Sequence, residues 1–147
     1  MVRRLLIFCM AVLLLGTVAV SAAEFDPDKT GAISVTLREQ QKQSPIAGAE
    51  LQLYHVATVR INTAGQLNYF YTKPFTETGL PLDTPELARL LDTYVSGKTV
   101  PSVTQVTGED GSAVWEELPL GLYFIRQANY SDVFYTSFRL HEESSAL

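Results

Sequence analysis

The sequence predicts an all-β protein, an antiparallel β-sandwich of about seven strands with one short inserted α-helix. Several short segments alternate apolar and polar residues, which is the pattern of strands that bury one face. Turn segments rich in Gly, Pro, Asn and Asp separate these runs. One segment instead repeats apolar residues every three or four positions, which is the spacing of a helix. Short strands that follow one another closely favour a sandwich over a parallel sheet.

The strand pattern is clearest in residues 32–38. There Ile33, Val35 and Leu37 share one side, and polar residues occupy the other. The next strand, in residues 49–59, is expected to direct Leu51 inward together with Leu53. Further strands are predicted, in chain order, at residues 67–72, 102–107, 112–118, 121–128 and 133–140.

The one helix is predicted within residues 82–97, where it is expected to lie against one end of the sheet. Asp83 and Glu86 match a capping box, Pro85 suits a first turn, and Gly97 suits a helix end. The first three leucines of the apolar stripe are expected to be buried. The stripe consists of Leu87, Leu90, Leu91, Tyr94 and Val95.

The N-terminus has the pattern of a secretory signal peptide over residues 1–23. Arg3 and Arg4 precede an apolar core at residues 5–20, and small residues follow at 21–23. A membrane anchor is the alternative, but the apolar run is shorter than the ~20 residues that span a bilayer. The mature chain is therefore expected to begin at Glu24 and to be secreted, extracellular or associated with the cell surface.

The mature chain is expected to hold one domain. Cys9 is the only cysteine, so its loss with the signal excludes a disulfide. Loss of two arginines changes the formal net charge from −5 to −7, which disfavours nucleic acid as a partner. The sequence after residue 23 has no second long apolar segment, so no membrane contact is expected after cleavage. The predicted parts are a polar leader at residues 24–30, the domain at 31–140 and a polar tail at 141–147.

The pattern of polar residues predicts no catalytic residue, no cofactor and no metal site. His55 and His141 are far apart, and neither has a second ligand at metal-binding spacing. Glu116 and Glu117 are adjacent on a predicted strand, where neighbours face opposite sides, so they do not form an acid–base pair. The sequence therefore favours a protein that is not an enzyme.

Two motifs resemble the Cna-B type, SpaA-like domain of Gram-positive (Firmicutes) surface and pilin proteins. One is P-I-A-G-A-E-L-Q-L-Y at residues 45–54, and the other is D-G-x-A-x-W-x-x-L-P-x-G-x-Y at 110–123. The resemblance extends over residues 31–127. It implies an immunoglobulin/prealbumin-like fold and a cell-surface or pilus setting. It also implies other surface proteins, or host and extracellular-matrix ligands, as partners.

Many members of that family form an internal isopeptide bond between a first-strand Lys and a last-strand Asn, assisted by a buried acid. The resemblance places Leu37 at the Lys position and Gln127 at the acid position. A leucine cannot form an amide, and a neutral glutamine cannot accept a proton. Both positions are therefore expected to be inactive. The family's C-terminal L-P-x-T-G sorting signal is not found either, so the protein is expected to be released or to be a fragment.

These patterns together predict a secreted, non-catalytic structural or adhesive module. The alternative is a secreted module that binds a glycan or a peptide on an aromatic surface near the helix. Aromatic side chains suit such ligands, although they more often pack in a core. The candidate ligand residues are Tyr69, Tyr71, Phe75 and Tyr94.

Overall fold

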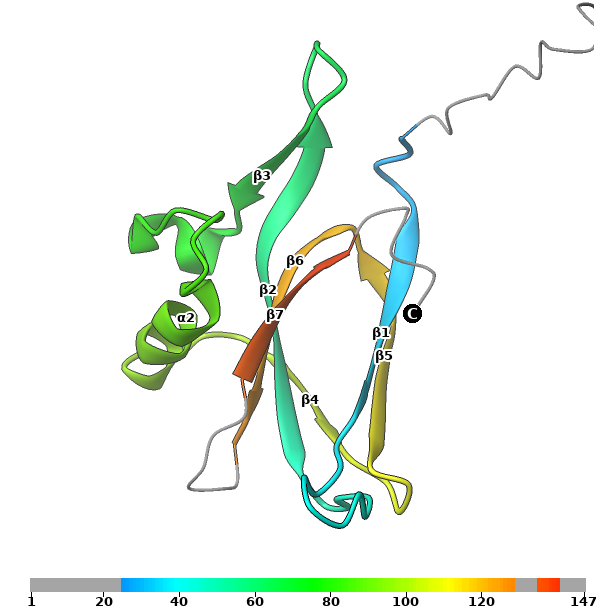
Figure 1. Ribbon diagram of the computed structural model, residues 1–147. Helices are drawn as coiled ribbons and strands as arrows, with labels where there is room; N and C mark the ends of the chain where they lie inside the picture. The colour runs from blue at the N-terminus through cyan, green and yellow to red at the C-terminus, as the bar shows by residue number, and fades with distance from the viewer. Residues whose placement is uncertain (1–24, 129–134, 141–147) are drawn as a thin grey trace, which may run out of the picture.

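The computed structural model describes residues 25–128 and 135–140, and the predicted signal peptide lies outside them. The described residues form antiparallel sheets, which confirms the predicted all-β sandwich (Figure 1). The strands are β1 Thr30–Thr36, β2 Glu50–Ile61, β3 Leu67–Tyr71, β4 Val103–Val106, β5 Ser112–Pro119, β6 Gly121–Gln127 and β7 Tyr135–Leu140. A 3-10 helix, η1, spans Lys73–Thr78, and the α-helix α2 spans Leu87–Ser96.

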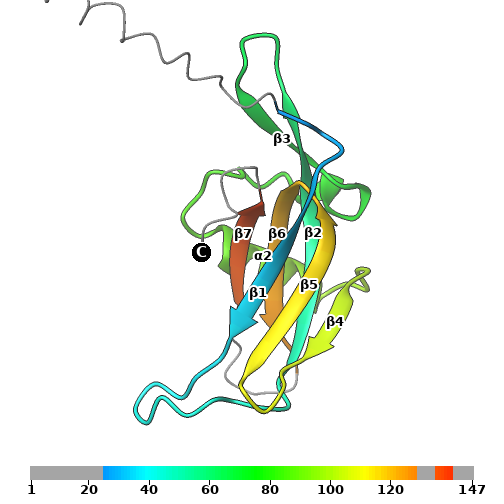
Figure 2. The same ribbon diagram turned by 90° about the vertical axis from the view of Figure 1, so that its right-hand side faces the viewer.

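Two sheets face each other in the sandwich. The smaller sheet contains β1 and β5, and the larger has the order β3-β2-β6-β7. Strand β4 also pairs with β2, next to Glu50–Leu53, whereas β3 pairs with the far end of β2 at Ala57–Ile61. Because β6 occupies the other edge of β2, β3 and β4 share one edge at its opposite ends. The two views in Figures 1 and 2 show the β1–β5 layer against the larger sheet.

The inner core fills the space between the two sheets. The alternation predicted for β1 is observed, since Ile33, Val35 and Leu37 are buried and the residues between them are exposed. The larger sheet contributes its own inward residues to the same cluster. The buried members of this cluster are Ile33, Val35, Leu37, Ala49, Leu51, Leu53, Val59, Ala113, Trp115, Leu120, Tyr123 and Ile125.

A second core lies on the opposite face of the larger sheet, where α2 and η1 cover it (Figure 1). The helix therefore lies on a face of the sheet, and the expectation that it lies against one end is corrected. The physical reason is that β2 and β6 are apolar on both faces, so both faces must be covered. The buried members of the outer core are Tyr54, Val56, Ala57, Phe75, Leu87, Leu91, Val95, Leu122 and Phe124.

The buried stripe of α2 is narrower than predicted. Leu87, Leu91 and Val95, at positions i, i+4 and i+8, are buried. Leu90 is only half-buried, which corrects the expectation that it is a core residue. Leu90 lies at the margin of the stripe, because one position along a helix is a rotation of about 100°.

The predicted capping box is not formed. Glu86 is the N-cap residue, and no side chain makes a capping hydrogen bond there. Its carboxylate instead lies 2.7 Å from the guanidinium of Arg89. Gly97 does end the helix, as predicted. In the part of the chain that the structure describes, no helix has the length and apolar character needed to cross a membrane.

The two glycines of the second motif are required by close backbone contacts. Gly111 has a φ of +78°, and a Cβ there would lie 2.4 Å from the carbonyl oxygen of Leu37. At Gly121 a Cβ would lie 2.2 Å from the carbonyl oxygen of Ala57. Any larger residue would push the neighbouring backbone apart. Both glycines are therefore required by the close approach of two backbone segments, which is a structural role.

Candidate functional site

The two positions that correspond to the isopeptide site lie at one end of the inner core. Leu37 directly follows β1, and Gln127 is the last residue of β6. Both side chains are buried, with exposed fractions of 9% and 7%. Gln127 is opposite Leu51 in the β2–β6 ladder, and Leu51 belongs to the same core cluster as Leu37. Strand parity directs both side chains toward the inner core between the sheets, and these two positions are called the buried corner below.

An isopeptide bond would need a lysine and an acid at these two positions, and the chain has Leu37 and Gln127 there. The four lysines that follow residue 23 are all exposed in the structure. Lys98, for example, lies 4.3 Å from the centre of the Tyr94 ring, on the helical side. The sequence of β7, Y-T-S-F-R-L, contains no asparagine. At the two described positions, the side chain of Leu37 has no amine and the side chain of Gln127 has no carboxylate.

A threonine that the sequence patterns did not single out holds the neighbouring turn. Thr107 is 3% exposed, and its hydroxyl donates to the carbonyl of Ile46 over 2.7 Å. The same hydroxyl accepts from the amide of Ala49 over 2.9 Å. The amide of Gly48 also donates to the Thr107 carbonyl over 2.9 Å. These bonds attach the P-I-A-G-A turn to the chain after β4, so the first motif is also structural.

The four aromatic residues of the alternative hypothesis lie on the helical side but do not form one open surface. Phe75 is 1% exposed in the outer core. Tyr71 and Tyr94 are both half-buried. The Tyr71 hydroxyl donates to the Leu80 carbonyl, and the Tyr94 hydroxyl donates to the Pro74 carbonyl over 2.8 Å. Both side chains therefore hold the connection around η1. Tyr69 is also half-buried and receives the guanidinium of Arg139, 5.4 Å above its ring.

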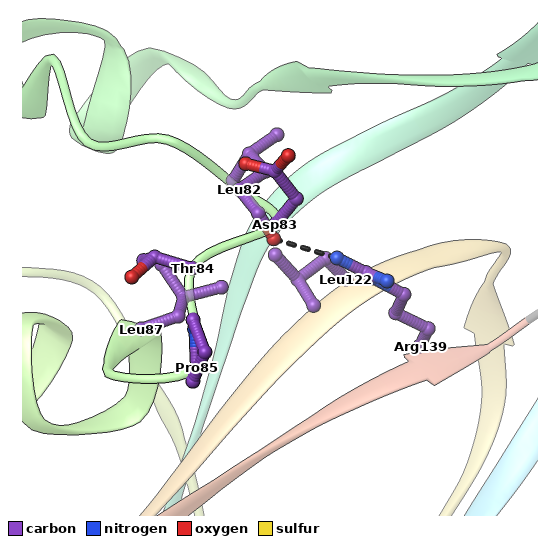
Figure 3. Close-up of a pocket in the computed structure, with 7 residues that line it drawn as sticks. All are labelled: Leu82, Asp83, Thr84, Pro85, Leu87, Leu122 and Arg139. Carbon is purple, nitrogen blue, oxygen red and sulfur yellow. Dashed lines mark hydrogen bonds between the residues drawn. The ribbon is translucent and has the colours of Figure 1, made fainter.

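A cleft of about 330 Å³ lies beside Arg139, between the connection that leads into α2 and the strands β6 and β7 (Figure 3). The guanidinium of Arg139 donates to the Leu82 carbonyl over 2.6 Å at its rim. Leucine side chains give the cleft an apolar floor, and an exposed carboxylate adds a negative group. The lining residues are Leu82, Asp83, Thr84, Pro85, Leu87, Leu122 and Arg139. Sequence patterns did not indicate this cleft, because its residues come from three separate segments.

His55 is the one histidine of the described residues, and it is half-buried on β2. Its ring stacks on Tyr123 at 4.7 Å with an interplanar angle of 11°. Its Nε2 is enclosed and has no partner with hydrogen-bond geometry. Burial lowers the pKa of His55, and the backbone of Ala57 opposes this effect only in part. Burial also raises the pKa of Tyr123, whose hydroxyl donates to the Pro119 carbonyl over 2.6 Å.

The lowered pKa of His55 predicts that acid destabilises the fold before the carboxylates titrate. The unfolded chain takes up a proton on His55 near pH 6.5, whereas the folded chain resists it until a lower pH. The contribution of neutral His55 is therefore complete above about pH 6.5 and is lost as the pH falls through the folded-state pKa. Urea unfolding at pH 7.5 and 5.5 should show a drop in the free energy of unfolding that is smaller in His55→Gln. An equal drop in both proteins would contradict this account of His55.

No metal centre is found in the part of the chain that is described, since no three His, Cys, Asp or Glu side chains gather there. His141 lies outside that part. Glu116 and Glu117 are both exposed on β5. Glu117 has a φ of +53°, at the place where the β1–β5 register shifts.

Comparison with solved structures gives two matches to pilus proteins. The group B streptococcus pilus 2b backbone protein aligns with a TM-score of 0.42 at 14% identity, over 78% of this chain and 34% of that protein. BcpA, the major pilin subunit of Bacillus cereus, aligns with a TM-score of 0.34 at 20% identity, over 76% of this chain and 24% of that protein. This chain thus spans about a third or less of either protein. Alignments at this level do not assign a function. No protein-family model and no curated protein matches the sequence.

Proposed function

We propose that this chain is a secreted, non-catalytic structural or adhesive module of a bacterial cell-surface or pilus-type protein. The supporting observation is that the two sequence motifs form strands and turns of the sandwich. Residues 45–54 form a turn held by Thr107 and the start of the central strand β2. Residues 110–123 supply β5, the tight turn at Gly121 and the start of β6. The motifs therefore hold the sandwich together.

The buried corner supports the further proposal that this module lacks the internal isopeptide bond. The supporting observation is that Leu37 and Gln127, which the resemblance aligns with the reacting Lys and the acid, are both buried. The four lysines that follow residue 23 are all exposed, and none belongs to the inner core. The module therefore depends on packing, not on a covalent link, for its stability.

Localisation in the native bacterium tests the proposed setting. Antibodies against the purified protein should label the outside of intact cells, or detect the protein in the culture supernatant. Permeabilised cells serve as the control for protein that has not been exported. Labelling found only after permeabilisation would contradict the proposal.

The cleft beside Arg139 favours one second candidate, the binding of a glycan or peptide by the aromatic strand. Tyr69 is connected to this cleft through Arg139, which contacts the Tyr69 ring and also lines the cleft. Screening on glycan and peptide arrays tests this candidate. Binding should weaken in Tyr69→Ala and persist in the matched control Phe70→Ala, whose side chain is 49% exposed on the neighbouring position. No binding, or equal loss in both variants, would exclude the candidate.

A further inference from the structure

Asp110 and Gly111 form the only Asp-Gly dipeptide of the sequence, which contains no Asn-Gly dipeptide. In such a dipeptide the backbone nitrogen of the glycine can attack the carboxyl group of the aspartate, because glycine has no Cβ to obstruct the approach. The product is a cyclic succinimide, which water opens to aspartate or to isoaspartate. In isoaspartate the backbone runs through the side-chain carbonyl, so the backbone is one methylene longer. This turn is therefore a position at which the chain can modify itself.

The folded turn engages both groups that this reaction needs. The hydroxyl of Ser112 donates to the carboxylate of Asp110, and its Oγ lies 2.7 Å from either carboxylate oxygen. The amide of Ser112 donates to the same carboxylate over 3.0 Å. The attacking group would be the nitrogen of Gly111, whose N–H donates to the Gly108 carbonyl over 2.9 Å. The carboxylate and the nitrogen are thus held by different partners.

The charge of Asp110 opposes the reaction as well. The hydroxyl and then the amide of Ser112 lower the pKa of Asp110, and the positive charge of Arg38 acts in the same direction. Ring closure expels one carboxyl oxygen as water, which requires a protonated carboxyl group. The hydrogen bonds that hold this side chain therefore also keep it in its unreactive, ionised form. Asp110 is exposed, so water is available to open any ring that forms.

We infer that Asp110–Gly111 is an isomerisation site of this chain, and that Ser112 protects it by holding the Asp110 carboxylate away from the Gly111 nitrogen. In the step that is suppressed, a bond forms between the Gly111 nitrogen and Cγ of Asp110. The Cγ–O bond breaks, and the hydroxyl leaves with the amide proton as one water molecule. Opening of the ring adds one water molecule back, so isomerisation changes no atom count and needs no other reactant.

An isomerised turn would not fit the fold. Gly111 is buried against the backbone of Leu37 and Ile46, where even a Cβ has no space. Its carbonyl accepts the amide of Leu37 over 2.8 Å, directly after β1. One additional methylene before Gly111 would displace this residue against both neighbours. Isomerisation is therefore expected to loosen the contact between this turn and the end of β1.

Incubation of the exported protein in water labelled with the heavy oxygen isotope measures the reaction without any substitution. Each opening of the ring raises the mass of the peptide that contains Asp110 by about 2 Da, and peptide mapping separates isoaspartate from aspartate. At neutral pH the folded wild type should isomerise about tenfold or more slowly than the wild type unfolded in urea. Equal rates in the folded and unfolded protein would overturn the inference.

Three variants test whether Ser112 provides the protection. Ser112→Ala removes the hydroxyl but keeps the backbone amide, and it should isomerise about threefold or more faster than the wild type. Ser112→Thr keeps the hydroxyl and should isomerise at the wild-type rate. Leu90→Ala alters α2 and leaves the turn intact, so it controls for unfolding and should also isomerise at the wild-type rate. A wild-type rate in Ser112→Ala, or the same acceleration in Leu90→Ala, would overturn the role of Ser112.

Discussion

Trp115→Ala is expected to lower the free energy of unfolding by about 3–5 kcal/mol, the range for removal of a buried large aromatic side chain. Trp115 is 3% exposed and projects from β5 into the inner core. Its indole Nε1 donates to the carbonyl of Val103 in β4 over 3.2 Å. The side chain therefore connects the smaller sheet to a strand of the larger one, and its loss removes both packing and a connection between the sheets.

Two variants separate these contributions. Trp115→Phe keeps most of the apolar volume but loses the hydrogen bond, so it should cost much less than Trp115→Ala. Val114→Ala alters the next residue, which is 43% exposed on the outer face, and should change stability by no more than about 0.5 kcal/mol. Urea unfolding followed by circular dichroism is suitable, because Trp115 is the only tryptophan. A cost for Trp115→Ala as small as that of Val114→Ala would contradict the position of this side chain.

Leu91→Ala is expected to lower the free energy of unfolding by about 2–5 kcal/mol. Leu91 is 0% exposed and is packed between α2 and the outer face of the larger sheet. Its neighbour Asp92 holds the helix to β6 through Arg126, with 2.8 Å between the carboxylate oxygen and Nε. This ion pair is only partly buried, so its contribution is expected to be smaller than that of the leucine.

Leu90→Ala is the matched control for Leu91→Ala. It removes the same atoms from the adjacent, half-buried position and should cost clearly less. Both variants can be compared by urea unfolding in one buffer. Equal costs, or a larger cost for Leu90→Ala, would show that α2 has a different face toward the sheet.

Local patterns predicted strands such as β1 because one face of the strand is buried and the other is exposed. The alternation in β1 correctly separated Val35 from its exposed neighbours, and the helical spacing correctly located α2. The strand pattern did not predict that α2 and η1 form a third layer on the outer face of the larger sheet, although the sequence of β6 indicates such a layer. In β6 the run G-L-Y-F-I is apolar at every side chain, so both faces of that strand need a cover. A run that is apolar on both faces indicates that a further element covers the second face of the sheet, and here that element is α2.

The sequence predicted the candidate site only where the direction of a side chain follows from its position in one strand. The burial of Leu37 and Gln127 follows from strand parity, and both residues are buried in the structure. The cleft at Arg139 depends on the twist of the sheet and on the path of the connection before α2. The hydrogen bonds of Thr107 likewise depend on a turn that lies about 60 residues earlier in the chain. Long-range contacts of this kind leave no local pattern.

The intact mass of the secreted protein tests the central claim most directly, that this is an exported module without a covalent cross-link. Formation of a Lys–Asn isopeptide bond releases ammonia and lowers the mass by about 17 Da. The predicted mass is the full residue sum from Glu24 to the end of the chain, with no such loss. A mass that includes residues 1–23 would contradict export with cleavage. A deficit of about 17 Da, with a Lys–Asn cross-linked peptide found after digestion, would contradict the inactive roles of Leu37 and Gln127.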